Sequence, residues 1–370
     1  MKIVGAGLVA ADIVLACDSS WVPLAVAEYT SGGTVTNVLT HLGYQGWDCY
    51  LVGGTGSDNL GSLVRTRLQH FKVNTDFLIT RQDMSTRRMG HLVSVTGPKK
   101  GEHRFAIRCP KCDGGFPPFN VVSVDELGSY PAFDSNTLLF IDRANALTVK
   151  LAENAKNAGS TVIFEPGYLP QDNRDIIQQV LNLTDILKYS QSLFFETRPF
   201  SEHAFSSPKN AKLIIETRSE NGVVVRSMTH RSRLRLTITP LTYAVDRAGA
   251  GDAFMAGFLV GLGDEGIADV GALNERKLEE AVQRGQALGA LACLYIGATS
   301  LLDNLSLNEL NDAIIRTVNE RKIPIELNNE SVQNSTIQKW LELHRLTEKK
   351  KQFQDDSICS LCELPYNKNK

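Results

Sequence analysis

The feature that most constrains the fold of this 370-residue chain is a repeated alternation of short apolar segments with helical patterns. Segments 3–8 and 49–52 have the apolar character of buried strands, whereas segments 35–42 and 60–70 have helical patterns. The same alternation resumes over residues 138–188. Strands that are separated by helices form a mostly parallel sheet with helices on both faces. The sequence therefore predicts an α/β fold.

Two regions depart from this alternation. Strand-like segments at 88–95 and 103–108 flank a turn at 97–101, with the sequence Gly-Pro-Lys-Lys-Gly. This arrangement predicts a β-hairpin inserted in the α/β frame. Near the C-terminus the sequence becomes more polar and keeps an apolar pattern at 337–346. We expect this part of the chain to be helical.

The composition is that of an ordinary soluble globular protein. Apolar residues make up 42% of the chain, charged residues make up 22%, and the formal net charge is −2. Such a small charge gives no general attraction to nucleic acid or to a membrane surface. The N-terminus reads as a first strand and lacks the regions of a signal peptide, and no apolar run approaches the ~20 residues of a membrane span. A cytoplasmic protein with no membrane or nucleic-acid partner is therefore expected.

One glycine-spaced run points to a reaction. The run at 246–252, Asp-Arg-Ala-Gly-Ala-Gly-Asp, leads directly into an apolar helical pattern. Such a run starts a helix whose free backbone N–H groups converge on one spot, and that spot suits an anion. Beside a bound phosphate, the carboxylate of Asp252 is useful as a base. The run therefore indicates phosphoryl transfer.

A second glycine-rich signature lies far upstream of this run. It reads Gly-Gly-Thr-Val-Thr-Asn at 32–37 and continues as Gly-x-x-Gly-x-Asp-x-x-Gly at 53–61. With both signatures the chain resembles the PfkB family of carbohydrate kinases, which have a ribokinase-like fold. The resemblance covers roughly residues 1–302. It implies a three-layer α/β sandwich with a central, mostly parallel sheet and a small β lid.

The resemblance also implies a domain organisation. Residues 1–302 would form the kinase domain, with the lid made by about 13–31 and 84–110. Residues 303–370 would form a helical C-terminal extension that ends in a Cys-x-x-Cys pair. By the same resemblance, a homodimer through the lid is plausible.

The family resemblance implies an activity and a set of site residues. The activity is ATP-dependent phosphorylation, with Mg²⁺, of a hydroxymethyl group on a sugar, nucleoside or related small molecule. Asp252 matches the catalytic base, and Asp12 matches the aspartate that binds substrate hydroxyls. Read without the family, Asp12 also fits a turn or N-cap aspartate, and Asn37 fits an ordinary polar helix residue. The matching anion hole and pocket residues are Gly249, Ala250, Gly251, Gly33 and Asn37.

The nucleotide site is expected at the carboxyl ends of the strands. The segment 216–222 resembles the family's Thr-x-Gly-x-x-Gly turn beside the nucleotide, with Thr217 and Gly222 in place and Ser219 replacing the first glycine. Gly297 and Ala298 resemble the segment that flanks the adenine. These glycines also fit ordinary turns.

One departure from the family concerns the metal. The family often has an Asn-x-x-Glu motif that assists Mg²⁺ and phosphate, and the aligned segment, which begins at Lys188, lacks both motif residues. The carboxylate for the metal's water shell must then come from elsewhere. Glu165 is the first candidate and Asp185 is the second. Since Mg²⁺ keeps several waters and needs few protein carboxylates, the loss need not abolish activity.

Two further departures concern charge near the substrate. Arg247 stands where a threonine or serine is common in the family, and it fits either a phosphate ligand or a surface arginine. Asp142 and Arg143 follow the strand predicted at 138–141, at a position that faces the substrate pocket in the fold. An acid–base pair there suggests a polar or charged substrate.

Two Cys-x-x-Cys pairs are not required by the family. Cys109 with Cys112 and Cys359 with Cys362 supply four thiolates, which is enough for one tetrahedral Zn²⁺ ion. A structural zinc ion there would pin the C-terminal tail to the loop that follows the hairpin. Reduced free cysteines and a redox dithiol are the alternatives, whereas a reducing location disfavours disulfides.

Two other functions remain open on the sequence alone. The absent Asn-x-x-Glu motif fits a catalytically silent ligand-binding protein, although the intact run up to Asp252 opposes it. A zinc-tethered tail could also dock a protein or RNA partner on a kinase fold.

Overall fold

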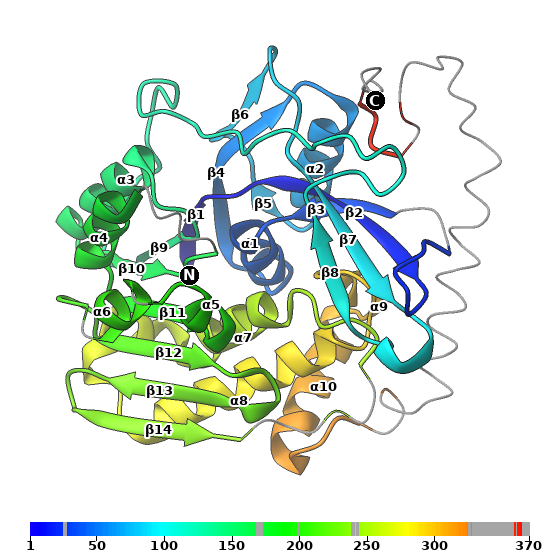
Figure 1. Ribbon diagram of the computed structural model, residues 1–370. Helices are drawn as coiled ribbons and strands as arrows, with labels where there is room; N and C mark the ends of the chain where they lie inside the picture. The colour runs from blue at the N-terminus through cyan, green and yellow to red at the C-terminus, as the bar shows by residue number, and fades with distance from the viewer. Residues whose placement is uncertain are drawn as a thin grey trace.

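The computed structural model describes residues 1–24, 28–167, 173–198, 200–206, 208–237, 241, 244–324, 327, 359 and 361–364. A ten-stranded sheet runs through its centre in the order β14-β13-β12-β11-β10-β9-β1-β4-β5, with β6 paired to β4 (Figure 1). The strands from β12 to β5 pair in parallel, and β13 and β14 add to one edge in antiparallel. The strands are β1 (Lys2–Ala6), β4 (Asp48–Gly56), β5 (Val73–Asn74), β6 (Leu78–Arg81), β9 (Thr137–Ile141), β10 (Thr161–Phe164), β11 (Ile186–Ser190), β12 (Leu213–Thr217), β13 (Val223–Ser227) and β14 (Ser232–Leu236).

Helices cover both faces of this sheet, as the alternation in the sequence predicts. Among the described residues, no helix combines the length and apolar character that crossing a membrane would require. One face carries α1 (Thr34–Tyr44), α2 (Asn59–His70), α7 (Ala250–Ala268), α8 (Glu275–Ala292), α9 (Leu301–Asn304) and α10 (Leu307–Glu320). The other face carries α3 (Ala146–Asn157), α4 (Arg174–Leu183), α5 (Gln191–Glu196) and α6 (Phe200–Ser206).

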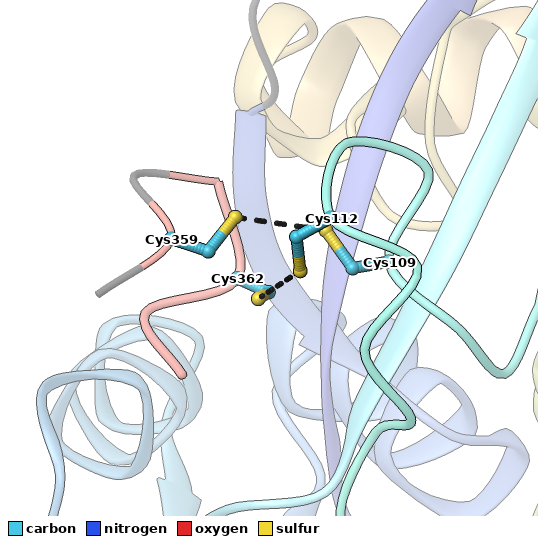
Figure 2. A group of neighbouring side chains, drawn as sticks. All are labelled: Cys109, Cys112, Cys359 and Cys362. Atoms are coloured by element: carbon cyan, nitrogen blue, oxygen red, sulfur yellow. Dashed lines mark hydrogen bonds between the residues drawn. The ribbon is translucent and has the colours of Figure 1, made fainter. Parts of the chain in front are cut away.

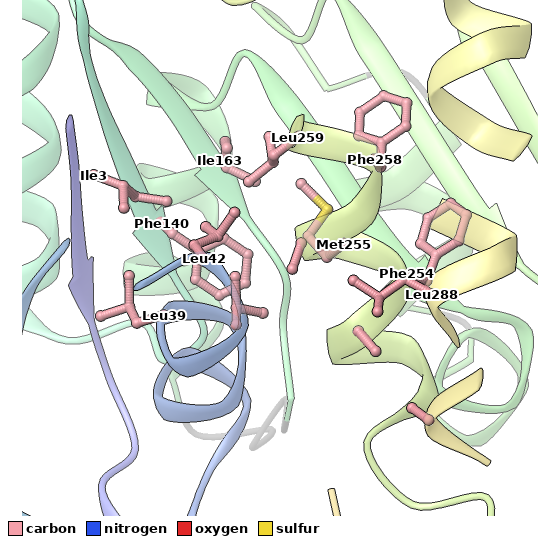
Figure 3. Close-up of a cluster of buried hydrophobic side chains, with 14 of the residues drawn as sticks. Ile3, Leu39, Leu42, Phe140, Ile163, Phe254, Met255, Phe258, Leu259 and Leu288 are labelled. Carbon is pink, nitrogen blue, oxygen red and sulfur yellow. The ribbon is translucent and has the colours of Figure 1, made fainter. Parts of the chain in front are cut away.

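The central strands are apolar on both sides because both sides are buried. In β9, Leu138 and Phe140 join the core under α1 and α7, whereas Leu139 and Ile141 join the core under α3 and α4. This division follows from the two-residue period of a strand. Figure 3 shows Phe140 beside side chains of α1, with Met255 and Leu259 of α7 close to the same layer. A continuous apolar run in the sequence therefore marks a strand in the middle layer.

A second sheet has four strands in the order β3-β2-β7-β8, and we call it the lid because it contains most of the two segments predicted for that role. It comprises β2 (Ala10–Cys17), β3 (Glu28–Gly32), β7 (Arg88–Ser94) and β8 (His103–Ala106). The antiparallel pair β7–β8 confirms the hairpin predicted around 97–101. We call the face with Ile13, Leu15 and Leu92 the outer face of the lid, and the face with Val14, Ala16 and Val93 the inner face. Both faces contain fully buried side chains, so the lid is covered from two sides.

Helix α7 contacts α8 at two glycines of α8, where a side chain would leave no room. A Cβ atom at Gly289 would lie 2.8 Å from the backbone oxygen of Ala250, and one at Gly285 would lie 2.7 Å from that of Phe254. Real Cβ atoms do not approach an oxygen so closely, so glycine at these positions permits backbone contact between the two helices. Ala250 is the first residue of α7. The contact therefore fixes the position of the N-terminus of α7.

The boundaries of several elements differ from those predicted. Strand β1 ends at Ala6 because the chain then turns toward the lid, and the N–H of Leu8 donates to Asp142. Helix α3, within the alternation predicted over 138–188, begins at Ala146 because Asn145 and Thr148 form a capping box. The C-terminal region is helical in α9 and α10, whereas the helix predicted at 337–346 lies outside the described residues.

The contact between α7 and α8 predicts a stability effect. Replacing Gly289→Val should lower the free energy of unfolding by about 1–3 kcal/mol, because the new side chain forces α7 away from α8. Urea denaturation followed by circular dichroism measures this change. Gly115→Val is the matched control, since a Cβ atom at Gly115 meets no atom within 4 Å. Equal loss of stability in both variants would contradict the proposed role of the contact.

Candidate active site

The N-terminus of α7 meets the ends of the central parallel strands. Asp252 lies in the first turn of α7, and Lys188 of β11 donates to the backbone oxygen of Gly251 at 3.3 Å. Asp142 directly follows β9, and Glu165 directly follows β10. Ligands bind at this edge in open α/β sheets. The structure thus brings these predicted catalytic, substrate-binding and cofactor-binding residues to one edge of the sheet.

The turn before α7 has a backbone conformation that requires glycine. Gly249 has φ 73°, and a Cβ atom there would lie 2.4 Å from the Cβ of Ala298. The first N–H groups of a helix have no partner within the helix, and the helix dipole adds partial positive charge. The backbone of Gly249, Ala250 and Gly251 is therefore a suitable anion site.

The two sequence signatures meet at Asp252. The side-chain N–H of Asn37, in the first turn of α1, donates to Oδ2 of Asp252 at 2.7 Å, across 215 residues of sequence. Gly33, the N-cap of α1, has φ 103°, and a Cβ atom there would lie 2.2 Å from the backbone oxygen of Leu8. Oδ1 of Asn37 is buried, with no hydrogen-bond partner among the described residues. That oxygen is available to a hydroxyl group of a ligand.

Asp12 lies on the inner face of the lid, close to this pair. Its side chain is 7% exposed and packs against Gly32, where a Cβ atom would lie 2.1 Å from the carboxylate. Burial raises the pKa of Asp12 to about 6, and the charge of Asp252 contributes, whereas His91 lowers it. Asp12 belongs to strand β2, so it is not the turn or N-cap residue that the sequence left open.

Burial also controls the protonation of Asp252. It raises the pKa of this carboxyl group to about 6, and nearby Lys188 and the hydrogen bond from Asn37 oppose the rise. Lys188 forms a buried ion pair with Oε1 of Glu165. Burial raises the pKa of Glu165 to about 7 despite this partner. The second oxygen of Glu165 is buried without a hydrogen-bond partner in the described part of the chain, so it can accept from a ligand or from a metal-bound water.

Asp142 holds the backbone around the pocket. Its two carboxylate oxygens accept the N–H groups of Leu8 at 2.8 Å and of Val35 at 3.0 Å, and the side chain is fully buried. These contacts join the end of β1 to the start of α1, which fits a positioning role better than direct contact with substrate. Arg143 is partly exposed and donates to the backbone oxygen of Asp142 at 2.7 Å.

The predicted nucleotide residues occupy turns near the same edge. Thr217 ends β12, and Ser219 and Gly222 lie in the tight turn between β12 and β13. Ser219 has φ 48° and Gly222 has φ 84°. Ser219 thus adopts a left-handed conformation, which costs a residue with a side chain about 1–2 kcal/mol. Arg247 is exposed at the start of the run.

Asp246 was missed as a site residue. Its buried carboxylate accepts the N–H groups of Ala248 and Gly297, both at 2.9 Å. His91 of β7 lies 3.1 Å from Oδ2, and His103 of β8 lies 3.6 Å from Oδ1. Burial opposes charge on both partners, but their attraction lowers the pKa of Asp246 and raises that of His91. The only sequence signal was the place of Asp246 at the start of the glycine run.

The second carboxylate suggested for the metal is wrong. Asp185 precedes β11, so it lies at the opposite edge of the sheet from Glu165. It accepts from Lys156 Nζ at 2.8 Å and from the N–H of Val162 at 2.9 Å. Asp185 thus has its hydrogen-bond partners within the fold, and its carboxylate has a structural role.

The four paired cysteines converge on one point at the lid (Figure 2). Their sulfur atoms all lie within 4.8 Å of one another. The Sγ atom of Cys109 lies 3.9 Å from that of Cys359, and the Sγ atom of Cys112 lies 3.7 Å from that of Cys362. These distances exclude disulfides, whose sulfur atoms are about 2.05 Å apart. A group of four thiols at this spacing can bind a metal ion.

Comparison with known proteins agrees with this geometry. The model of the pfkB family carbohydrate kinases matches residues 2–305. A fructokinase from Klebsiella pneumoniae is 28% identical over 291 residues, which cover 73% of this chain and 88% of that protein.

Two solved structures share the fold. The ribokinase of Giardia lamblia matches with a TM-score of 0.68 at 16% identity, and the match covers 85% of this chain and 99% of that one. Aminoimidazole riboside kinase from Salmonella enterica has a TM-score of 0.64 at 19% identity, with 85% of this chain and 100% of that one covered. The chain therefore belongs to the pfkB family of carbohydrate kinases, which are phosphotransferases with an alcohol group as acceptor.

Proposed function

We propose that this chain is an ATP-dependent kinase for a hydroxymethyl group of a sugar, a nucleoside or a related small molecule. The observation that carries the proposal is the position of Asp252. Its carboxylate lies in the first turn of α7, is oriented by Asn37 and has a pKa raised to about 6. A base whose pKa lies just below neutral pH is ionised and still accepts a proton readily.

On the substrate side, different residues orient the acceptor, remove its proton and stabilise the transferred charge. Asp12 and the free oxygen of Asn37 accept hydrogen bonds from substrate hydroxyl groups and so orient the acceptor. Asp252 takes the proton from the reacting hydroxyl group. The backbone N–H groups of the 249–251 turn stabilise the charge on the transferred group, where the helix dipole also acts.

The donor side has residues that fit ATP and Mg²⁺. When bound, ATP with Mg²⁺ supplies the phosphoryl group and neutralises part of its charge. The unpartnered oxygen of Glu165 fits a water of the Mg²⁺ shell, so Glu165 replaces the absent Asn-x-x-Glu motif in our proposal. Lys188 keeps Glu165 in place. We propose that the nucleotide is bordered by Thr217, Ser219 and Gly222, and by Gly297 and Ala298.

Two further proposals concern the lid. We propose a structural Zn²⁺ ion at the four cysteines, whose donor set and spacing suit it.

We also propose a homodimer through the lid, because the edge of the lid at β8 is apolar. Phe105 in β8 is 54% exposed and Ile107 beyond it is 64% exposed. Exposed apolar side chains that lie close together favour an interface.

The substrate in this proposal carries an anionic group. Arg87 and Arg143 are both partly buried, and burial, followed by the charge of Arg143, lowers the pKa of Arg87. Arg143 also acts on the pKa of Asp252, so its guanidinium group lies near the proposed base. Two neighbouring cations that are partly removed from water favour a phosphate or carboxylate between them.

A catalytically silent ligand-binding protein is the second candidate, since the Asn-x-x-Glu motif is absent. The Glu165–Lys188 pair weakens this argument, because it supplies a carboxylate at the same edge. Ligand binding without phosphoryl transfer, across a panel of sugars and nucleosides that includes phosphorylated and carboxylated members, would favour the silent protein.

The first test removes the proposed base. Asp252→Asn should lower kcat by about 10²–10⁴-fold, because the amide cannot accept the hydroxyl proton. A coupled assay of ADP release measures kcat, and thermal shift with the same sugar or nucleoside shows whether binding is retained. Asp125→Asn, at an exposed carboxylate, is the control and should keep full activity. An active Asp252→Asn variant would contradict the assignment of the base.

The raised pKa values predict the pH dependence. Asp252 is active when ionised, so kcat/KM should rise with pH through about 6 and fall by about tenfold per unit below that value. Ionisation of Asp12, whose pKa is also about 6, should steepen the acid limb. Rate measurements from pH 5 to about 8.5 test this, with Asp252→Asn as the reference. The residual kcat/KM of that variant should not show the loss at acid pH that protonation of Asp252 causes in the wild type.

The arginine pair predicts selectivity for charged substrates. Arg143→Ala should raise KM about 10- to 100-fold for a phosphorylated or carboxylated sugar, because a charge-assisted hydrogen bond is lost. KM for a neutral sugar should change little. Arg276→Ala, on the exposed surface of α8, is the matched control. If the wild-type enzyme prefers neutral sugars, the anionic substrate is excluded.

A further inference from the structure

The outer face of the lid is covered by two segments that are far apart in the sequence. One is the loop with Cys109 and Cys112, which follows β8. The other consists of Cys359 and residues 361–364, which we call the tail segment. Both segments join one apolar cluster with the side chains on the outer face. The members of this cluster are Ile13, Leu15, Cys17, Leu92, Cys109, Phe116, Cys359 and Cys362.

The two Cys-x-x-Cys turns have the same backbone structure. In the first, the N–H of Asp113 donates to the oxygen of Cys109, and the N–H of Cys109 donates to the oxygen of Gly114, both at 2.8 Å. In the second, Glu363 and Leu364 repeat these bonds with Cys359, both at 2.9 Å. The residue after the second cysteine is left-handed in each turn, with φ 56° at Asp113 and 54° at Glu363.

These two turns of the same structure bring four sulfur atoms within 4.8 Å of one another. A tetrahedral ion with Zn–S bonds of about 2.3 Å places its ligands about 3.8 Å apart. The pairs Cys109–Cys359 and Cys112–Cys362, at 3.9 Å and 3.7 Å, have this spacing. Three of the four cysteines are at most 2% exposed, and their neighbours are apolar. The cluster is thus shielded from water, as a structural metal site requires.

The tail segment also satisfies polar groups of the lid. The Nε of Arg88 in β7 donates to the backbone oxygen of Cys362 at 2.7 Å. The hydroxyl of Tyr29 in β3 donates to the backbone oxygen of Leu361 at 2.6 Å. Arg88 is 1% exposed and is the largest fully buried side chain among the described residues. Leaving a buried guanidinium group without such a partner strongly lowers the stability of the fold, so the stability of the lid depends on the tail segment.

The same arginine connects the tail segment to the main domain. Its second guanidinium nitrogen lies 3.2 Å from Oδ2 of Asp58. Asp58 is the N-cap of α2 and accepts the N–H of Gly61 at 2.9 Å and of Thr86 at 3.0 Å. A chain of contacts therefore runs from the tail segment through the lid to α2.

The outer and inner faces of the lid are formed by adjacent residues. On β2, Ile13 packs toward the cysteines, whereas Asp12 faces the proposed base. On β7, Leu92 packs outward, whereas His91 contacts Asp246. A shift of either strand on the outer face must also move the residues on the inner face.

We propose that one zinc ion, bound by the four cysteines as thiolates, fastens the tail segment to the outer face of the lid and keeps the inner face in the shape that binds substrate. The effect on substrate rests on the proposed kinase function, whereas the zinc site and its effect on the lid do not. Zinc loading would thus set substrate affinity without any zinc contact with the reacting atoms.

Metal analysis tests the site first. Wild-type protein that has never met a chelator should contain about one zinc per chain, and the Cys359→Ser/Cys362→Ser variant should contain almost none. Cys49→Ala, at a buried cysteine of the main sheet, is the control and should keep its zinc. Less than about half an equivalent of zinc, or iron in its place, would overturn the assignment.

Hydrogen exchange then tests the link to the lid without any substrate. After zinc is removed from the wild-type protein by a chelator, the amides of β2 and β7 should exchange about tenfold faster or more, whereas those of β9 and β10 should not change. Using the wild-type chain avoids dependence on whether the double variant folds. Tyr29→Phe should keep its zinc and show a smaller increase in the same strands. Unchanged exchange in the lid after zinc loss would overturn the proposal.

Kinetics test the effect on substrate. For the panel sugar or nucleoside that the wild-type enzyme phosphorylates best, zinc removal should raise KM about tenfold and lower kcat less. Readdition of zinc should restore KM. An unchanged KM, with faster exchange in the lid, would overturn the effect on substrate while the zinc link to the lid stands. If no panel member is phosphorylated, the kinase proposal fails, and the metal and exchange measurements still decide the rest.

Discussion

The buried carboxylate of Asp246 is the point at which the parts of the site are joined. Taking a carboxylate out of water is costly, and the cost is offset only if its oxygens are well satisfied. Here the backbone N–H groups of Ala248 and Gly297 donate to these oxygens, and the imidazole of His91 lies 3.1 Å from Oδ2 as an ion-pair partner. One side chain thus ties the glycine turn, the loop after α8 and the lid together. Displacement of any one of them would leave a buried charge without its partners.

This arrangement joins the lid to the glycine turn before α7, so the lid is not a separate flap. His91 and His103 come from the two strands of the hairpin, and both approach the same carboxylate. Asp12 lies on the neighbouring strand, so its position depends on the same sheet. The inner face of the lid is therefore held by charge, whereas its outer face is held by apolar packing and by the tail segment.

The site also indicates how a departure from the family pattern can be accommodated. The Asn-x-x-Glu motif is missing after β11, yet the neighbouring strand β10 is followed by Glu165, whose carboxylate pairs with Lys188. Parallel strands end at one edge, so a carboxylate can be supplied there by any of several neighbouring strands. In our proposal, the chemistry of the edge is retained although its position in the sequence has moved.

The sequence by itself determined the features that depend on local order. Alternating apolar segments specified the sheet and its two helical layers, and the glycine run specified a helix that starts near Asp252. The two Cys-x-x-Cys pairs indicated a shared metal site, and their sulfur atoms do converge. Each of these follows from the period of a strand, from the start of a helix or from a short spacing, and each can be read without knowledge of distant contacts.

Only the tertiary structure decided the contacts between distant segments. It joined His91 and His103 to Asp246, placed Asp185 at the wrong edge for the metal, and turned both oxygens of Asp142 toward the backbone. It also brought the tail segment onto Arg88. The sequence could not show these contacts, because they depend on which strands are neighbours and on which face each side chain lies. A strand has two faces, and only the assembled fold decides what each face meets.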